Sequence, residues 1–242
     1  IGAESSARHF ALLLDTHLRD ARAEDEEEFR AIMERGADGL WRSRRDGFDG
    51  VRQAGIWAPD QALDTAGKRS FFVQARRLVE VYGTGARRRQ FVDTWILPSD
   101  NGEIIFWPGQ PDFVYQAEAG QDYRPTEWFR LTAPEANPEG AARWTSTSYD
   151  PVARSWMISV VAPFRRQGQW AGSVGHDLII RDLFERMMPM LNYPRSQLVM
   201  LDNHGRVLVS TRYQDIVEAS AGQARLADLH DGPLAAAFQS GQ

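Results

Sequence analysis

The sequence predicts an α+β fold in which a long N-terminal helix packs along two tandem antiparallel sheets, the second of them truncated. Apolar residues recur at three- and four-residue steps through residues 4–48 without an intervening proline, which is the pattern of an amphipathic helix. Two strand–turn–strand patterns follow, one around Asp100 and one around Asp202, so two related sheets are expected in tandem. Few further strands fit between the second pattern and Gln242.

Two features stand out within the predicted N-terminal helix. Gly36 and Gly39 are positions where it would bend or stop. The acidic run 24–28 lies in its middle and is expected to form a solvated face. Alternatively, Glu24 and Glu27 could share a face and bind a metal ion.

The rest of the chain alternates helical patterns with short strands of period two. Residues 109–149 are rich in proline and aromatic residues and are expected to be irregular. Helices are predicted over residues 67–81 and 178–190. Successive strands are joined by tight turns, which favours antiparallel pairing. The strands are predicted over residues 91–97, 103–107, 156–163, 170–174, 198–201 and 206–210.

The composition is that of an ordinary globular protein and excludes several functions. Apolar residues make up 43% and charged residues 25%, and a net charge of −5 argues against nucleic-acid binding. The absence of cysteine excludes disulfides, thiolate metal sites and a cysteine nucleophile. The five histidines lack metal-ligand spacing, and nucleophile-elbow, zinc-protease and P-loop motifs are missing. No cofactor is expected.

Three segments, in this order, resemble the motifs of double-Cache sensor domains, which are PAS-like extracytoplasmic domains of bacterial transmembrane receptors. Residues 122–129 are similar to the family's Asp-Pro-Arg-x-Arg-Pro-Trp-Tyr segment. Ser148-Tyr149 resembles its downstream tyrosine, and residues 174–178 resemble the strand that ends in Gly-x-Asp-Ile. The resemblance covers most of the chain.

The resemblance implies a small-molecule pocket in the first, membrane-distal sheet. Its aromatic wall can face a cation, and a carboxylate at its floor can pair with an amine. In members that bind amino acids, an arginine grips the ligand carboxylate where Thr126 stands here. Ordinary amino acids are therefore expected to bind poorly, although Arg124 or Arg143 could substitute. The expected ligand-binding residues are Trp128, Phe129, Tyr149, Asp177, Arg124, Thr126, Trp144 and Asp150.

Several of these residues also have a purely structural interpretation. Trp128 and Phe129 fit the role of core aromatics. Asp177 could cap a helix that begins at Leu178. Residues 149–151 are typical of a turn.

The resemblance implies a sensor and not an enzyme. The chain is expected to be the periplasmic, extracytoplasmic sensing domain of an inner-membrane receptor with a histidine kinase, diguanylate cyclase or chemoreceptor output. Transmembrane helices are expected before Ile1 and after this segment. The alternative is a periplasmic hydrolase or lyase with a carboxylate site around Asp150 and Asp177.

Three domains follow from the resemblance. Residues 1–58 are expected to form a signalling helix through which the receptor makes a homodimer. Residues 59–190 are expected to form the membrane-distal ligand-binding domain, and residues 191–242 part of a membrane-proximal one. The expected ligand is a small organic molecule that can carry an amine.

Overall fold

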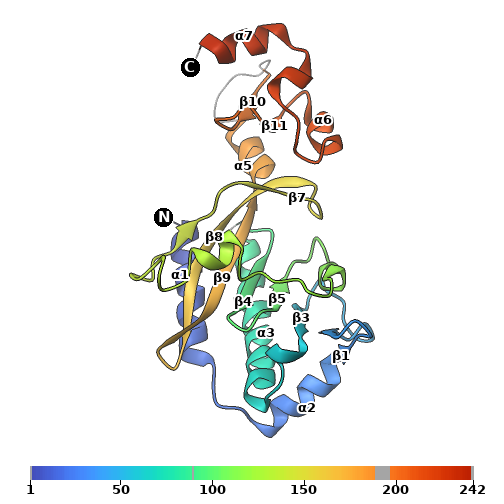
Figure 1. The fold of residues 1–242 in the computed structure, drawn as a ribbon, viewed down its shortest axis with the longest axis vertical. Coiled ribbons are helices and arrows are strands. Elements are labelled where there is room, and N and C mark those ends of the chain that lie inside the picture. The colour runs from blue at the N-terminus through green and yellow to red at the C-terminus, as the bar shows by residue number, and fades with distance from the viewer. Residues whose placement is uncertain (1, 89, 189–196, 241–242) are drawn as a thin grey trace. The chain divides into compact units, whose positions relative to one another are not determined.

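The computed structural model describes residues 2–88, 90–188 and 197–240 and combines helices with antiparallel strands (Figure 1). Trp95, for example, pairs with Ile105 on one neighbouring strand and with Gly175 on the other, both in antiparallel register. The predicted α+β class is therefore confirmed.

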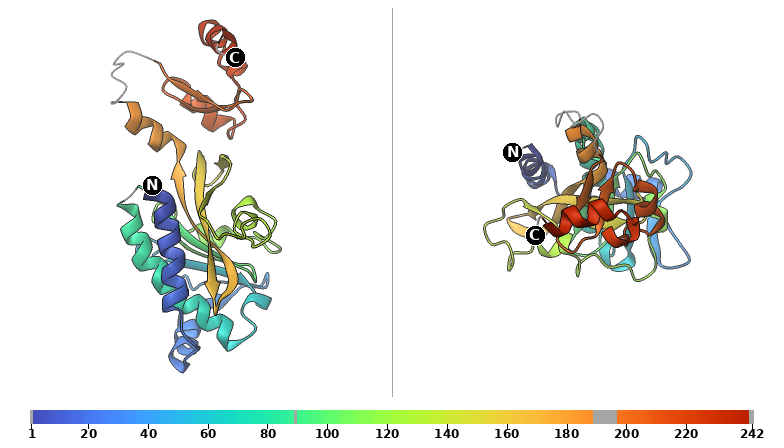
Figure 2. Two further views of the ribbon diagram at one scale, coloured as in Figure 1. Left: turned by 90° about the vertical axis from the view of Figure 1, so that its left-hand side faces the viewer. Right: turned by 90° about the horizontal axis from the view of Figure 1, so that it is seen from above.

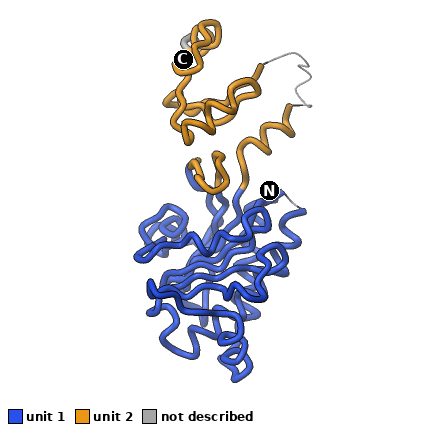
Figure 3. The backbone as a smooth tube through the Cα atoms, turned by 90° about the vertical axis from the view of Figure 1, so that its right-hand side faces the viewer, with its two compact units in different colours: residues 1–146, 159–177 blue, residues 147–158, 178–242 orange. Residues whose placement is uncertain are grey.

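The chain divides into two compact units, each with its own core (Figure 3). Unit 1 consists of residues 1–146 and 159–177, and unit 2 consists of residues 147–158 and 178–242. Strands β8 and β9 contribute residues to both units, so each unit is described by itself below.

Nine strands of the described residues form one sheet, in the order β1-β2-β3-β5-β4-β9-β8-β6 with β7 paired to β8. The bounds are β1 Met33–Arg35, β2 Leu40–Ser43, β3 Gly55–Pro59, β4 Thr94–Pro98, β5 Glu103–Phe106, β6 Arg143–Trp144, β7 Ser148–Asp150, β8 Ser155–Arg166 and β9 Gln169–Ile179. The hairpin predicted around Asp100 is β4–β5, and the predicted strands 156–163 and 170–174 lie within β8 and β9.

Helices α1 and α3 lie side by side on one face of the unit 1 sheet (Figure 2). The Thr65 side chain caps α3 by accepting a hydrogen bond from the backbone N–H of Lys68 at 3.3 Å. The buried stripe of α1 follows the helical period and comprises Ala7, Phe10, Ala11 and Leu14. The helices of unit 1 are α1 Gly2–His17, α2 Ala23–Ile32, α3 Ala66–Arg87 and α4 Glu127–Arg130, with the 3-10 helices η1 Asp60–Ala62 and η2 Phe113–Gln116.

The single helix predicted over residues 4–48 is wrong. Helix α1 ends at His17, α2 ends at Ile32, and residues 33–43 form the β1–β2 hairpin. Gly39 lies in the hairpin turn with φ +83°, a left-handed conformation that glycine adopts without steric cost. The apolar residues of this stretch fit the period of a helix, but they lie in the two strands β1 and β2.

Side chains beyond α1 stabilise the break between α1 and α2. The backbone N–H of Arg19 donates to Oε1 of Gln74 at 2.8 Å, and that of Arg22 donates to Oδ2 of Asp25 at 3.3 Å. Backbone groups that a continuous helix would have satisfied thus find other partners. Because Gln74 belongs to α3, the periodicity of the first 48 residues does not encode the break.

The acidic run 24–28 docks α2 against α3 through Asp25, Glu26 and Glu28, so the predicted solvated face is limited to Glu24 and Glu27, which are exposed. Asp25 is 2% exposed and accepts hydrogen bonds from Ser70 Oγ at 2.6 Å and from Gln74 Nε2 at 2.8 Å. The ion pairs between the two helices are Asp25–Arg77, Glu26–Arg69, Glu28–Arg76 and Glu28–Arg77. No cluster of three or more potential metal ligands occurs among the described residues.

His176 is fully buried at the centre of unit 1. Its ring stacks on Phe91, with centroids 4.4 Å apart, and lies 5.7 Å from the ring of Tyr82 and 6.0 Å from that of Phe10. Its Nδ1 lies 3.0 Å from Oγ1 of Thr94. Packing therefore accounts for the environment of His176.

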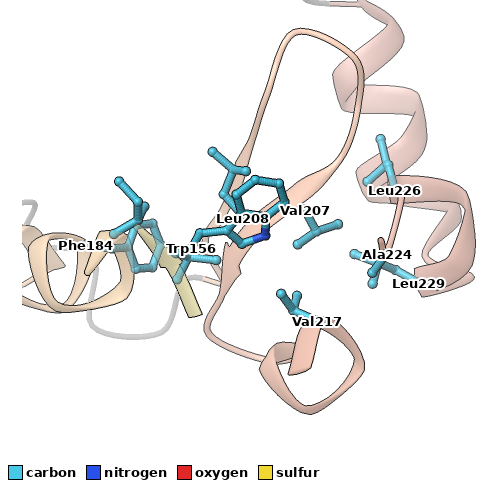
Figure 4. Close-up of a cluster of buried hydrophobic side chains, with 10 residues drawn as sticks. Trp156, Phe184, Val207, Leu208, Val217, Ala224, Leu226 and Leu229 are labelled. Carbon is cyan, nitrogen blue, oxygen red and sulfur yellow. The ribbon is translucent and has the colours of Figure 1, made fainter. Parts of the chain in front are cut away.

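Unit 2 has a separate hydrophobic core (Figure 4). The pair β10 Val199–Leu201 and β11 Val207–Ser210 confirms the hairpin predicted around Asp202. The helix predicted over residues 178–190 is α5, and residues 189–190 lie outside the described residues. The helices are α5 Ile180–Met187, α6 Gln214–Ala219, the 3-10 helix η4 Leu226–Leu229 and α7 Gly232–Ser240. The buried side chains are Trp156, Ile180, Phe184, Val207, Leu208, Val209, Val217, Ala224, Leu226 and Leu229.

Candidate functional site

The site is on the face of the unit 1 sheet that lies opposite α1 and α3. Successive side chains of a strand point to opposite faces, and His176 of β9 packs against the rings of α1 and α3. Ser173, Gly175 and Asp177 therefore share the other face, which the segment containing α4 covers (Figure 2).

Trp95 of β4 lies over Gly175 and binds Asp177. Its indole Nε1 donates a hydrogen bond to Oδ1 of Asp177 at 3.2 Å. A Cβ atom on residue 175 would stand 2.3 Å from Cζ2 of Trp95, so the ring reaches this position only because residue 175 is glycine. The glycine, the indole and the carboxylate thus form one structural unit.

Asp93, directly before β4, is the most deeply buried acidic residue of the site. It is 1% exposed, and its Oδ1 accepts the backbone N–H of Asp177 at 3.1 Å. Its Oδ2 is buried and has no hydrogen-bond partner among the described residues. Burial, together with the negative charge of Asp177, raises the pKa of Asp93 well above its ordinary value.

A second indole–carboxylate pair lies on the same face. Trp57 of β3 donates from Nε1 to Oε2 of Glu103 on β5 at 2.9 Å, and both residues are buried. The ring of Tyr123 lies 5.6 Å from that of Trp57. Together with Asp93 and Asp177, this pair makes the face acidic and rich in tryptophan, which suits a cationic ligand.

Trp128 of α4 is anchored on this face. Its Nε1 donates to Oγ of Ser159 at 2.8 Å, and its carbonyl oxygen accepts from Oγ of Ser173 at 2.9 Å. Phe129 is 7% exposed and packs edge-on against Trp170 at a centroid distance of 5.0 Å. Phe129 is therefore a core aromatic residue, which was its structural interpretation.

Trp128 and Asp177 share a face but occupy different positions along it. Ser173, which holds the Trp128 carbonyl, precedes Asp177 by four residues, and four residues of strand span about 13 Å. Trp95 covers Gly175 between them. A ligand that contacts both predicted residues must therefore also contact Trp95.

The two arginines considered for gripping a ligand carboxylate are paired locally. Arg124 binds Asp122, with Nη2 2.8 Å from Oδ2, and Arg143 binds Glu139. Half of the Arg124 side chain is exposed. Neither guanidinium is thus held ready for a ligand carboxylate.

Thr126 and Trp144 make contacts outside the acidic face. Oγ1 of Thr126 donates to the carbonyl oxygen of Tyr123 at 2.5 Å. Trp144 is 40% exposed, and its Nε1 donates to Oε1 of Glu4 on α1 at 3.1 Å. Both contacts have a structural role.

Tyr149 and Asp150 belong to unit 2. The Tyr149 ring packs edge-on against Trp156 at 5.9 Å. Asp150 accepts the backbone N–H groups of Val152 at 2.8 Å and Ala153 at 2.7 Å, and burial raises its pKa. These hydrogen bonds form a turn, which was the structural interpretation of residues 149–151.

The capping role considered for Asp177 is wrong. Asp177 lies within β9, and α5 begins at Ile180 with no side-chain cap. Sequence reasoning missed Asp93 and Trp95. Side chains alternate between the two faces of a strand, so the strand predicted over residues 91–97 already places Asp93 and Trp95 on the same face. This alternation could have identified both residues from the sequence.

Comparison with known proteins finds similar solved structures that are domains of chemoreceptors. No family model matches the chain, and no curated protein matches it. Several solved structures match it. The Pseudomonas aeruginosa amino-acid chemoreceptor PctC ligand-binding domain, in complex with GABA, is 17% identical over 64% of this chain and 62% of its own, with a TM-score of 0.43.

Two further neighbours are of the same kind. The ligand-binding domain of Pseudomonas fluorescens CtaA, with L-alanine, is 17% identical over 63% of this chain and 59% of its own, with a TM-score of 0.41. The sensory domain of Campylobacter jejuni Tlp3 (CcmL), with isoleucine, is 13% identical over 88% of this chain and 74% of its own, with a TM-score of 0.42. The chain thus spans less than two thirds of the first two domains.

The neighbours are ligand-binding or sensory domains of chemoreceptors. At this level of identity and TM-score, the ligand and the site of this chain have to be argued from its own residues. In the parts of the chain that the structure describes, no helix is long and apolar enough to span a bilayer.

Proposed function

We propose that this chain is the extracytoplasmic sensing domain of a membrane-bound receptor and that it binds a small organic amine at Asp177. The supporting observation is the cluster of Asp93, Asp177 and Trp95 on the covered face of the unit 1 sheet. A carboxylate pairs with an ammonium group, and an indole face attracts a cation.

The chemistry around Asp177 favours an amine over an ordinary amino acid. Thr126 stands where the resembled family has a carboxylate-binding arginine, and Arg124 and Arg143 are engaged with acidic neighbours. An amino acid would bring its own carboxylate next to the carboxylate of Asp177. A ligand with a positive nitrogen and no carboxylate avoids that repulsion.

A thermal-shift screen of the purified chain with alkylamines, amino acids, purines and organic acids tests the proposal. We expect amines to raise the unfolding temperature of the wild type. In Asp177→Asn the affinity for the best amine should fall about 100-fold or more, since breaking a buried charge pair costs roughly 3–5 kcal/mol.

Asp46→Asn is the matched control, because Asp46 is an exposed aspartate of unit 1. It should bind the amine like the wild type. Strong stabilisation by a compound whose only charge is a carboxylate, undiminished in Asp177→Asn, would show that the site binds an anion.

We infer further that the receptor is membrane-anchored and forms a homodimer through α1, which replaces the predicted helix of residues 1–58 in this role. Leu12 supports this inference, because 57% of it is exposed on α1, opposite the stripe that packs in unit 1. The chain contains no cysteine, so a Leu12→Cys substitution introduces a unique thiol in it.

Disulfide crosslinking of Leu12→Cys receptors in membranes should join two copies, and a Val81→Cys control on the exposed side of α3 should crosslink poorly. Equal crosslinking at both positions would contradict a dimer through α1. The domain boundaries at residues 58 and 190 remain predictions. The acidic tryptophan face consists of Trp57, Asp93, Trp95, Glu103 and Asp177, and all of these except Trp57 lie within the predicted ligand-binding domain, residues 59–190.

A further inference from the structure

Unit 1 contains a hollow of about 380 Å³ at a different place from the acidic tryptophan face. It lies between the first turns of α3, the β4–β5 turn and the β8–β9 turn. None of Asp93, Trp95, Trp128 and Asp177 lines it. Its volume is within the range of small-molecule pockets, about 300–1,000 Å³. The lining residues that matter chemically are Lys68, Phe71, Phe72, Asp100, Arg166 and Trp170.

Arg166 supplies positive charge that is not neutralised locally. Among the described residues, no carboxylate forms an ion pair with it; its Nη2 lies 3.5 Å from the carbonyl oxygen of Gly67. The guanidinium carbon lies 5.7 Å from the centroid of the Phe71 ring. An arginine beside an aromatic ring and free of a carboxylate is well suited to bind an anion in bidentate fashion.

Lys68, the other cation of the hollow, is already compensated. Its Nζ lies 3.2 Å from Oδ1 of Asp64 and 3.4 Å from Oδ2 of Asp100. Asp100 is the acidic residue of the lining, and its pairing with Lys68 reduces its repulsion of an anion. Among the charged residues that line the hollow, Lys68 and Asp100 compensate each other, and Arg166 is the cation without an ion-pair partner.

Trp170 adds a hydrogen-bond donor. Its Nε1 is buried and has no acceptor among the described residues. The ring itself is fixed by its edge-on contact with Phe129 at 5.0 Å. A buried donor without an acceptor costs roughly 1–3 kcal/mol, which a ligand oxygen would recover.

We propose that this hollow is a second ligand site, which binds a small monocarboxylate with an apolar body. Arg166 holds the carboxylate, Trp170 Nε1 donates to one of its oxygens, and the apolar body packs against Phe71 and Phe72. The site has a polarity opposite to that of the Asp177 site, so the two sites bind different classes of molecule.

Isothermal titration of the purified chain with benzoate tests this site, with chloride and benzyl alcohol as probes of charge alone and of the ring alone. Benzoate should bind more tightly than either. We expect Arg166→Gln to weaken benzoate binding at least about tenfold, Arg166→Lys to weaken it less, and Trp170→Phe to weaken it about fivefold while the aromatic packing is kept.

Arg165→Gln is the matched control, because Arg165 is the neighbouring exposed arginine and does not line the hollow. It should bind benzoate like the wild type, and each variant should keep the far-ultraviolet circular dichroism of the wild type. No benzoate binding by the wild type, or equal binding by Arg166→Gln and the wild type, would overturn the proposal.

Asp177→Asn separates this proposal from the proposed function. It should abolish amine binding and leave benzoate binding unchanged. Loss of benzoate binding in Asp177→Asn would mean that benzoate occupies the acidic face, which overturns the second site. Failure of amines to bind, with benzoate binding intact, would contradict the proposed function alone.

Discussion

Asp93 and Asp177 are joined across β4 and β9 by a hydrogen bond from the backbone N–H of Asp177 to Oδ1 of Asp93, 3.1 Å long. The bond holds two acidic residues side by side, one fully buried and one half-buried. Burial disfavours the charged carboxylate of Asp93, and the adjacent Asp177 repels it, so the pKa of Asp93 is raised and its neutral form is favoured. The charge of the site therefore depends on pH.

Asp93→Asn should stabilise the chain at neutral pH. The pKa of Asp93 is raised in the folded state above the ~3.9 of an unfolded aspartate, so the folded state holds the proton more tightly. The stability that results is complete below the unfolded pKa and is lost as pH rises through the folded pKa. Asparagine keeps the shape without the ionisation, and we expect a gain on the order of 1–3 kcal/mol at about pH 7.

Thermal unfolding from about pH 4 to about pH 8 measures this effect. The fall in unfolding temperature with rising pH should be shallower in Asp93→Asn than in the wild type. The exposed Asp46→Asn should keep the wild-type slope. A wild-type slope in Asp93→Asn as well would mean that Asp93 is ionised throughout this range.

Asp25→Asn should have the opposite effect. Burial alone would raise the pKa of Asp25, but hydrogen bonds from Ser70, Gln74 and the backbone of Arg22, with the charge of Arg77, outweigh it and lower the pKa. A lowered pKa contributes stability that is present above the unfolded pKa and is lost as pH falls through the folded pKa.

Asp25→Asn is expected to cost about 2–3 kcal/mol at neutral pH, the worth of hydrogen bonds to a buried charge. Urea unfolding at about pH 7 and about pH 3 is the measurement. Glu24→Gln, an exposed change on the same helix, should stay within about 0.5 kcal/mol of the wild type. If the two variants are equally stable, α2 does not dock through its acidic run.

Phe10→Ala should detach α1 from the core of unit 1. Phe10 is fully buried, and its ring stacks on Tyr82 with centroids 4.6 Å apart. Removing such a ring typically costs about 3–5 kcal/mol. Leu12→Ala on the same helix, at a 57% exposed position, should cost less than about 0.5 kcal/mol. Chemical denaturation of both variants compares the two costs, and a similar cost at both positions would contradict the observed face of α1.

Gly175→Ala should displace Trp95 from Asp177. The added Cβ would lie 2.3 Å from the indole, and overpacking of this kind costs roughly 1–3 kcal/mol. Gly85→Ala on α3, where no atom lies within 4 Å of the new Cβ, should be neutral or stabilise by up to about 1 kcal/mol. Unfolding temperature and tryptophan fluorescence report both effects. Unchanged fluorescence in Gly175→Ala would show that the indole keeps its place.

Local sequence patterns were sufficient to predict most strands and turns. The β4–β5 hairpin follows from alternating apolar residues on both sides of a turn in which Asn101 and Gly102 have positive φ, as residues of that type tolerate. Helix α3 follows from its apolar stripe. The helix over residues 4–48 failed because Met33 and Leu40 fit a helical period and a hairpin equally well.

The sequence by itself determined the α+β class, both Asp-Asn turn hairpins, α3 and the candidate carboxylate Asp177. Only the tertiary structure decided that Gln74 accepts the backbone N–H of Arg19 after α1, that the acidic run pairs with α3, and that Asp93 and Trp95 meet Asp177. The partners in these contacts lie far apart in the chain, 55 residues for Arg19 and Gln74 and 82 for Trp95 and Asp177. Periodicity describes which face of a single element is apolar, whereas the side chain that meets that face is chosen by packing.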